Sequence, residues 1–216
     1  MIMQQLHKLS LLLILLTLSS CSTALKQDID ADKTISQQIA KPVQNWSTEA
    51  KQSFELANTL IKTDTQKAIS EFQKTIVLEP KMEAAYFNLL RLYYETNRYE
   101  TNSKEQMELL MTKANDQRIL SARILTLYAA SLREKGKFKA AEKHYSQALE
   151  EDANHLAALA NMGILQDLYL GNLSFALYYY QQYQEQLSVQ NKDDKRVINW
   201  LADIKQRIKR AKKENG

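Results

Sequence analysis

Residues 141–183 read AEKHYSQALEEDANHLAALANMGILQDLYLGNLSFALYYYQQY, and the spacing within this stretch decides the fold. Ala141, Tyr145 and Ala148 are separated by four and three residues. Residues three and four apart lie on one face of an α-helix, so a small residue and an aromatic residue share that face. The small residue allows a second helix to approach closely, and the aromatic ring fills the space beside it. The spacing therefore predicts a helix packed tightly against a neighbour.

The same order of residues occurs in two other segments. A small, an aromatic and a third packing residue, again four and three apart, stand at Ala68, Phe72 and Thr75 and at Ala176, Tyr180 and Tyr183. Five residues later come Pro80 in the first copy and Ala153 in the copy at 141–148. Upstream stretches with spacings of three, one and three predict the partner helices, at Tyr86, Leu89, Leu90 and Tyr93 and at Leu159, Met162, Gly163 and Gln166. Gly136 and Gly171 fall where the two helices of a hairpin must turn.

Together these residues resemble the tetratricopeptide repeat, a helical hairpin of about 34 residues with the pattern W-x-x-L-G-x-x-Y, then A-x-x-x-F, then P. Ala141 and Ala176 are 35 residues apart, close to this period, and the resemblance covers residues 50–187. One hairpin departs from the pattern, since its second helix lacks the Ala-aromatic pair and an insertion precedes Ile119. We therefore predict an all-α, tetratricopeptide-type solenoid of about four helical hairpins.

Residues 196–213 (RVINWLADIKQRIKRAKK) form one amphipathic segment after the repeats. Its apolar stripe consists of Val197, Leu201, Ile204 and Ile208, and basic residues fill most of the remaining positions. A helix of this kind caps the last repeat and shows its charges to water, as stacked repeats require. The alternative is a basic amphipathic helix that contacts anionic lipid headgroups.

The composition of the whole chain agrees with an all-α fold. Its 216 residues include only four Gly and two Pro, which favours long helices over a turn-rich β fold. The formal net charge is +4, and residues 1–20 contribute only Lys8 to it. This balance is not the strongly basic footprint of a nucleic-acid-binding domain.

The N-terminus predicts a lipoprotein signal. Leu9 to Leu18 (LSLLLILLTL) is an apolar run of the length of a signal-peptide core, too short for a permanent membrane span. Leu18-Ser19-Ser20-Cys21 follows and resembles the lipobox of bacterial lipoproteins, which implies acylation of Cys21. Cys21 is the only cysteine, so no intramolecular disulfide is possible. Ser22 rather than Asp follows it, which by resemblance to lipoprotein sorting patterns favours the outer membrane, facing the periplasm.

These features divide the chain into four parts. We expect a signal peptide at 1–20, an acylated cysteine and flexible tether at 21–47, the repeat array at 48–190, and a basic capping helix and tail at 191–216. The tether is polar, carries Pro42 and shows no sustained apolar period. It would hold the repeats near the membrane.

The sequence argues against an enzyme. His144 and His155 are eleven residues apart and match no zinc-protease motif, and no Gly-rich phosphate loop or G-x-S-x-G elbow is present. The acidic pairs, such as Glu150-Glu151, fall at predicted helix ends or in loops, where acids usually cap helices or face water. We predict no catalytic residues, no metal site and no cofactor.

Function is therefore expected on the repeats. By resemblance to the family, the first helix of each hairpin lines a concave groove that faces a bound peptide. The groove residues that this implies are Phe87, Asn88, Arg91, Tyr94, Arg123, Arg133 and Asn161. The asparagines can hydrogen-bond an extended backbone, and the arginines can pair with a carboxylate.

We expect a lipid-anchored scaffold or assembly factor that binds envelope proteins. By resemblance in layout to pilus-biogenesis pilotins and repeat proteins of TonB systems, a type IV pilus-like or TonB-type machine is the first candidate. The alternative is an adaptor or binding module for cell-wall hydrolases, peptidoglycan or a peptide ligand. Self-association is a third possibility, because the first predicted helix (Phe54, Leu56, Ala57, Leu60, Ile61) has no obvious polar cap.

Overall fold

The computed structural model describes residues 45–96 and 103–214, and all of these except Asn45 belong to one unit, Trp46–Gly216. The predicted signal peptide, Cys21 and most of the tether lie outside the described residues. Every regular element within the described ranges is helical. None of these helices has the length and apolar character needed to cross a membrane.

The first two hairpins follow from local sequence signals. Ser47 and Asp64 each accept a hydrogen bond from a backbone N–H three residues on, which fixes the starts of two helices. A third helix begins soon after Pro80, which has no N–H to continue the preceding helix. The helices are α2 (Thr48–Leu60), α3 (Thr65–Leu78), α4 (Glu83–Thr96) and α5 (Ser103–Asp116).

In each of the next two hairpins, a glycine turn connects the first helix to the second. Gly136 and Gly171 have φ values of 72° and 69°, a region that residues with a side chain rarely adopt, as the sequence predicted. Ser121 caps the first of these helices by accepting a hydrogen bond from Ile124 N. The helices are α6 (Ala122–Glu134), α7 (Phe138–Glu151), α8 (Leu156–Ile164), the π-helical turn η1 (Leu165–Tyr169) and α9 (Leu173–Val189).

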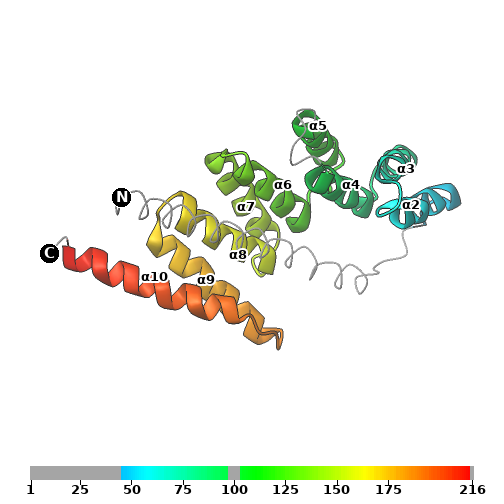
Figure 1. Cartoon of the computed structure of the whole chain (residues 1–216). Helices are drawn as coiled ribbons and strands as arrows, with labels where there is room; N and C mark the ends of the chain where they lie inside the picture. Colours follow the sequence, from blue (N-terminus) through cyan, green and yellow to red (C-terminus); the bar gives the residue numbers. More distant parts are fainter. Residues whose placement is uncertain (1–44, 97–102, 215–216) are drawn as a thin grey trace, which may run out of the picture. The chain divides into compact units, whose positions relative to one another are not determined.

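The hairpins α2–α3, α4–α5, α6–α7 and α8–α9 stack in chain order (Figure 1). The first helices of neighbouring hairpins also contact one another. α6 packs on both α4 and α8. The arrangement therefore places α4, α6 and α8 in one row, with their partner helices beside it.

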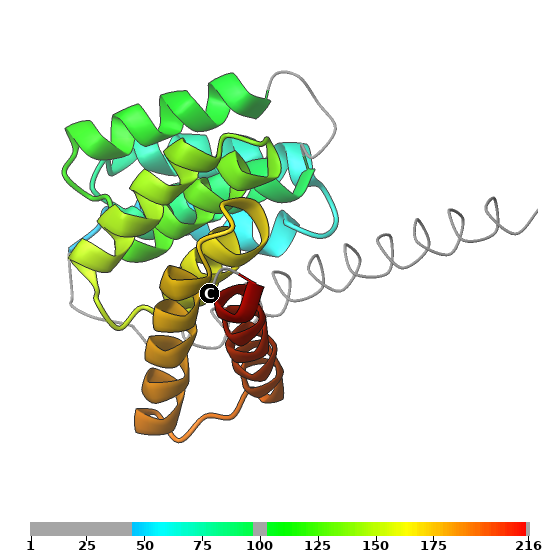
Figure 2. The same ribbon diagram turned by 90° about the vertical axis from the view of Figure 1, so that its left-hand side faces the viewer.

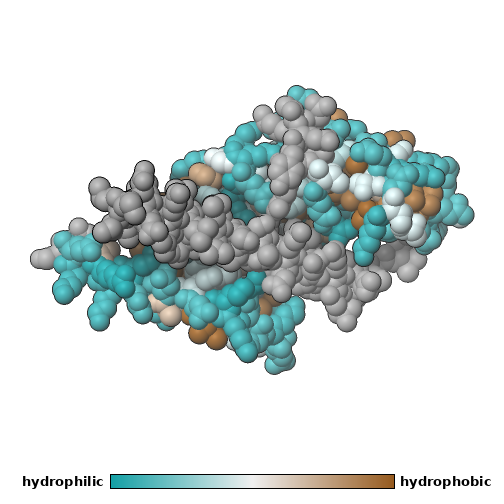
Figure 3. Space-filling model, viewed as in Figure 1, coloured by the Kyte–Doolittle hydropathy of each residue, from teal (hydrophilic) through white to brown (hydrophobic). Residues whose placement is uncertain are grey.

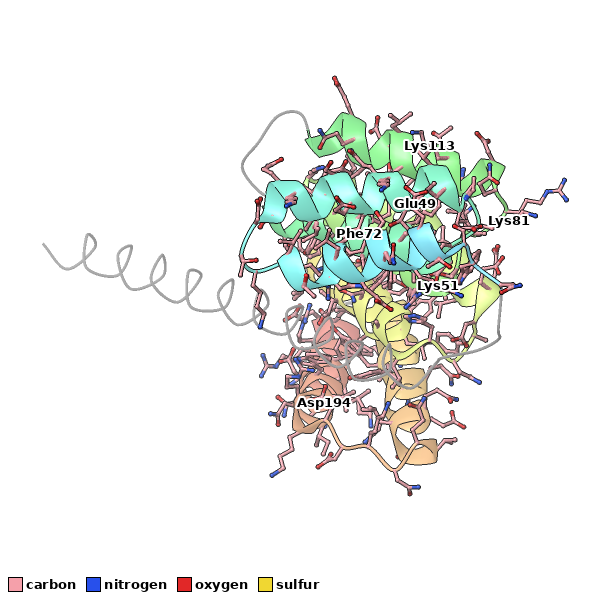
Figure 4. All side chains as sticks on the ribbon, turned by 90° about the vertical axis from the view of Figure 1, so that its right-hand side faces the viewer. Glu49, Lys51, Phe72, Lys81, Lys113 and Asp194 are labelled. Carbon is pink, nitrogen blue, oxygen red and sulfur yellow. The ribbon has the colours of Figure 1, made fainter. Side chains whose placement is uncertain are left out.

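The repeated small-aromatic pairs form the contacts within and between hairpins. In all three copies the small residue is fully shielded from solvent, and the aromatic ring is 0–1% exposed, at Phe72, Tyr145 and Tyr180. Phe72, labelled on α3 in Figure 4, packs edge-on against Phe54 of α2, with ring centroids 5.7 Å apart. Gly163 of α8 lies so close to Tyr180 that a Cβ atom there would stand 2.5 Å from the ring. The spacing in the sequence therefore reflects close helix packing.

The hairpin that departs from the repeat pattern folds by another solution. α5 has no Ala-aromatic pair, and four other residues take its place in the core, Met107, Leu110, Met111 and Ala114. Met side chains are unbranched and flexible, so they fill a space that the aromatic ring fills elsewhere. After α5 the chain turns through Arg118, which has a φ of 56° although it is not glycine. This turn accommodates the insertion that precedes Ile119.

A last helix, α10 (Lys195–Glu214), lies beside α9 (Figure 2). Val197, Leu201 and Ile204 are buried, and Trp200 packs on Tyr180 with ring centroids 5.0 Å apart. Asp194 joins the two helices, since it caps α10 through Arg196 N and accepts a hydrogen bond from the Tyr183 hydroxyl at 3.0 Å. The predicted solenoid of four hairpins with a C-terminal capping helix is confirmed.

Candidate protein-binding surface

The predicted groove residues lie on α4, α6 and α8, the row of first helices. Together with Thr126 of α6 and Asp167 of η1, the turn that continues α8, we call this set the first-helix surface. Its members are Phe87, Asn88, Arg91, Tyr94, Arg123, Thr126, Arg133, Asn161 and Asp167. Most of these side chains are buried, although they are polar or charged. Burying a polar group is costly unless it is hydrogen-bonded, so the partner of each group matters.

Arg123 already has a carboxylate partner within the chain. Its Nε donates to Glu83 Oε1 at 2.8 Å, and its Nη2 pairs with Glu83 Oε2, so the contact is bidentate. The Ser121 hydroxyl donates to the same Glu83 Oε1 at 2.6 Å, and the guanidinium lies 4.6 Å from the ring centroid of Phe87. Bidentate pairs are strong and geometrically specific. Arg123 therefore ties α6 to α4.

Two further residues of the surface connect neighbouring first helices. The Tyr94 hydroxyl of α4 donates to Glu134 Oε1 of α6 at 2.6 Å. Arg133 of α6 donates to Asn161 Oδ1 of α8 at 3.1 Å, while Asn161 itself donates to Ala157 O at 2.8 Å. These hydrogen bonds run across the row of helices and stabilise their register.

Both ends of the surface are also occupied by contacts within the chain. At the first hairpin, Asn88 Nδ2 donates to Asn58 Oδ1 of α2 at 3.0 Å. At the last, Arg207 of α10 donates to Asp167 Oδ1 at 2.6 Å. Partial burial alone would lower the pKa of Arg207, but its pairs with Asp167 and Asp203 outweigh this and raise it. Through Arg207, the capping helix α10 thus pairs with Asp167, the acidic residue of the surface in the fourth hairpin.

Arg91 differs from the other arginines of the surface. It lies near the middle of α4 and is only 8% exposed. Its Nε has no hydrogen-bond partner, which is also true of Arg133 Nε. Arg133 donates through Nη1 to Asn161, however, whereas within the described residues the Arg91 guanidinium makes no hydrogen bond or ion pair. Thr126 of α6 is 6% exposed, and its Oγ1 is likewise without a partner. A buried donor left unsatisfied costs about 1–3 kcal/mol, and more when the group is charged. A bound segment or a water molecule can supply the acceptor that such a group lacks.

The sequence predicted Arg91 as a site residue. It did not identify the carboxylates that bind Arg123 and Tyr94. Glu83–Arg123, Tyr94–Glu134 and Asp167–Arg207 are each 40 residues apart. The first two pairs link α4 to α6, and the third links η1, which continues α8, to α10. A search for opposite charges about one repeat length apart finds Glu83–Arg123 and Asp167–Arg207 but not Tyr94–Glu134. By this measure α10 takes the place of a fifth first helix.

The described residues contain no group of three or more His, Cys, Asp or Glu side chains arranged to hold a metal ion. His144, one of the two histidines considered above, is half-buried and stacks edge-on against Tyr128 at 5.0 Å. His155 caps α8, since its Nδ1 accepts a hydrogen bond from Ala158 N at 3.3 Å. Both histidines thus have structural roles in this fold.

Neither a protein-family model nor a curated protein matches this sequence. Solved structures do match it. A thermophilic TPR protein of Thermus thermophilus superimposes over 73% of this chain and 81% of its own, with a TM-score of 0.56 and 20% identity. The fold is a tetratricopeptide-repeat solenoid.

Two other solved solenoids are similar to this chain to about the same degree. The MamA protein matches 66% of this chain and 74% of its own, with a TM-score of 0.52 and 15% identity. A tetratricopeptide repeat protein from Parabacteroides merdae matches 68% of this chain and 56% of its own, with a TM-score of 0.51 and 19% identity. At these identities the likeness concerns the fold alone.

Proposed function

We propose that this protein is a lipid-anchored, periplasm-facing scaffold that binds another protein on the first-helix surface. The observation that carries the proposal is Arg91, a buried cation in the middle of that surface whose guanidinium has no hydrogen-bond or ion-pair partner among the described residues. Arg123, Arg133 and Asp167 each have such a partner within the chain, so Arg91 differs from the other charged residues of the surface. A carboxylate or a backbone carbonyl of a bound segment would supply the acceptor.

The membrane anchor in this proposal rests on the sequence. An apolar run from Leu9 to Leu18 followed by Leu18-Ser19-Ser20-Cys21 supports acylation of Cys21, and Ser22 supports delivery to the outer membrane. Several acyl chains on one residue would give firm attachment. A tetratricopeptide solenoid held in this way suits an assembly factor of an envelope machine, for which a type IV pilus-like or TonB-type system is our first candidate.

The proposal assigns no catalytic residue and no cofactor to the chain. Apart from the bond from Asn161 to Ala157 O, the polar contacts described on the first-helix surface connect helices of the solenoid to one another, which is the pattern of a rigid support. A rigid surface loses little freedom on binding, so more of the contact energy appears as affinity.

The test is affinity capture from detergent-solubilised envelopes, read by mass spectrometry. The variants are Arg91→Met, which keeps an apolar stem but removes the charge, and Cys21→Ser, which removes the proposed acylation site. Lys67→Glu on the exposed side of α3 serves as the control for a surface charge change. We expect a discrete set of envelope proteins with the unchanged chain and the control, and loss of that set with Arg91→Met.

Two results would contradict the proposal. If Arg91→Met retains the same partners at the same yield, binding does not use the first-helix surface. If no envelope protein is enriched but cell-wall fragments are, the protein is a glycan- or peptide-binding module instead. Labelling with a palmitate analogue checks the anchor separately, since the label must appear in the unchanged chain and disappear in Cys21→Ser.

A further inference from the structure

The solvent-facing side of α10 carries an excess of positive charge that the capping role does not require. Six cationic residues of this helix are exposed, Lys195, Lys205, Lys209, Arg210, Lys212 and Lys213. Its acids are Asp203 and Glu214, and Asp203 already lies 3.3 Å from Arg207. In the view of Figure 3 the surface along α10 is mostly hydrophilic. The exposed side of the helix is therefore strongly cationic.

The positions of these cations follow from helix geometry. At about 100° per residue, Lys209, Arg210 and Lys213 project away from the buried stripe of Val197, Leu201 and Ile204. That stripe packs on α9, so it is unable to insert into a bilayer. What α10 offers to a partner is charge, without an apolar face.

These cations are not used inside the protein. Within the described part of the chain, no ion pair engages any of the six. The other two basic residues of the helix, Arg196 and Arg207, pair with Asp194 and Asp167 at 2.7 and 2.6 Å. Six like charges on one helix repel one another, and this repulsion is relieved when an anionic surface lies against them.

We propose that the outer side of α10 binds anionic phospholipid headgroups. The partner is a lipid surface because the proposed tether at Cys21 keeps the solenoid within reach of a membrane, and in this respect the inference rests on the proposed function. Each Lys or Arg near an anionic leaflet adds attraction that salt screens. The acyl anchor and the basic helix would be two attachment points that together orient the solenoid on the membrane.

The experiment uses the processed chain, residues 21–216, with Cys21→Ser, so that no acyl chain contributes to binding. Sedimentation measures its binding to vesicles of phosphatidylcholine alone and of phosphatidylcholine with phosphatidylglycerol, at low and high salt. The test variant carries Lys209→Glu, Arg210→Glu and Lys213→Glu. The control carries Lys51→Glu, Lys62→Glu and Lys81→Glu, which change the net charge equally but lie in or beside the first hairpin (Figure 4).

We expect binding only to the vesicles with phosphatidylglycerol, weakened by salt. The α10 variant should bind at least about 100-fold more weakly, since each of the three lost cations contributed a factor of about five and the three added carboxylates are repelled by the anionic leaflet. The first-hairpin control should bind normally. Circular dichroism verifies that both variants remain helical.

Equal binding to phosphatidylcholine, or equal losses in the two triple variants, would overturn the assignment of this side of α10. Absence of binding to either vesicle would do the same, and the basic side would then be assigned to an acidic protein. Because these measurements involve purified protein and lipid, they are independent of the capture experiment with Arg91→Met. Failure of one proposal is therefore distinguishable from failure of the other.

Discussion

At Arg91, the stability of the folded chain and the proposed binding of a partner favour different side chains. A buried guanidinium without a full set of acceptors destabilises the folded chain, and a protein keeps such a group when it serves a partner. Arg123 and Arg133, on the next first helix, instead donate to Glu83 and Asn161, although Arg133 Nε also lacks an acceptor. The difference is that Arg123 and Arg133 join two helices, whereas Arg91 makes no such contact among the described residues.

This contrast leads to the first prediction. Arg91→Met should leave the free energy of unfolding unchanged or raise it by up to about 1 kcal/mol, because it removes an unsatisfied buried charge and keeps the apolar stem. Arg123→Met should lower it by about 2–4 kcal/mol, because it leaves the Glu83 carboxylate without its bidentate partner. Urea unfolding followed by circular dichroism measures both. A large loss of stability in Arg91→Met would show that Arg91 is structural.

His144 gives the second prediction, which concerns pH. Burial, the largest cause, and the positive charge of Lys143 lower the pKa of the His144 imidazole below its ordinary value of 6.5. The unfolded chain therefore takes up a proton at a higher pH than the folded protein does, so stability is fully present above pH 6.5 and falls as the pH drops toward the lowered pKa. His144→Phe, which preserves the ring contact with Tyr128, should remove this part of the pH dependence. Unfolding free energies measured above and below pH 6.5 for both proteins test it, and an unchanged slope in the variant would contradict it.

At the scale of helices, the packing between α8 and α9 depends on the absence of a side chain at Gly163. An added Cβ would lie 2.5 Å from two ring carbons of Tyr180, which is itself held between α8 and Trp200 of α10. The ring is unable to move aside without disturbing both neighbours. The close approach of α8 and α9 depends on how the two helices pack together. The helix propensity of the residue at this position does not explain it.

The third prediction compares two glycines. Gly163→Ala should destabilise the protein by about 1–3 kcal/mol through overpacking, although Ala is the better helix former. Gly136→Ala, at a turn with φ of 72° and open space around it, should cost about 1–2 kcal/mol through backbone strain alone. Tyr180→Leu should relieve the first variant and leave the second unaffected. Thermal unfolding of the single and double variants decides this, and equal behaviour of both glycines would refute the packing argument.

The helices also show which features the sequence was able to predict. The repeated spacing at Phe72, Tyr145 and Tyr180 reports packing between neighbours in the chain, so it was readable from one sequence. The core role of Met107 in α5 was not, because flexible side chains follow no fixed pattern. Likewise Glu83–Arg123 depends on the register between helices 40 residues apart, which is set only once the hairpins stack. The position of the surface was therefore predictable, whereas the partners of its residues were not.

At the scale of the whole solenoid, each hairpin contacts its neighbours in the chain. These contacts run along the first-helix row and also between the second helix of one hairpin and the first helix of the next, as in α3–α4 and α7–α8. In such a quasi-one-dimensional structure, loss of an end cap weakens the nearest repeat first. α10 is bound to that repeat by its apolar stripe and by the pair Arg207–Asp167. The stability of the fourth hairpin should thus depend on α10 far more than that of the first hairpin does.

The last prediction tests this with Leu201→Ala combined with Ile204→Ala. Both side chains are buried on α10, and each truncation should cost about 2–5 kcal/mol, enough to release the cap from α9. Hydrogen exchange should then show lost protection in α8 and α9 and unchanged protection in α2 and α3, because opening spreads only to neighbouring repeats. Ile198→Ala, at a position 54% exposed on the same helix, is the matched control and should change neither. If protection is lost evenly over all hairpins, the solenoid unfolds as one cooperative unit, and the capping helix stabilises the whole array instead of its last repeat.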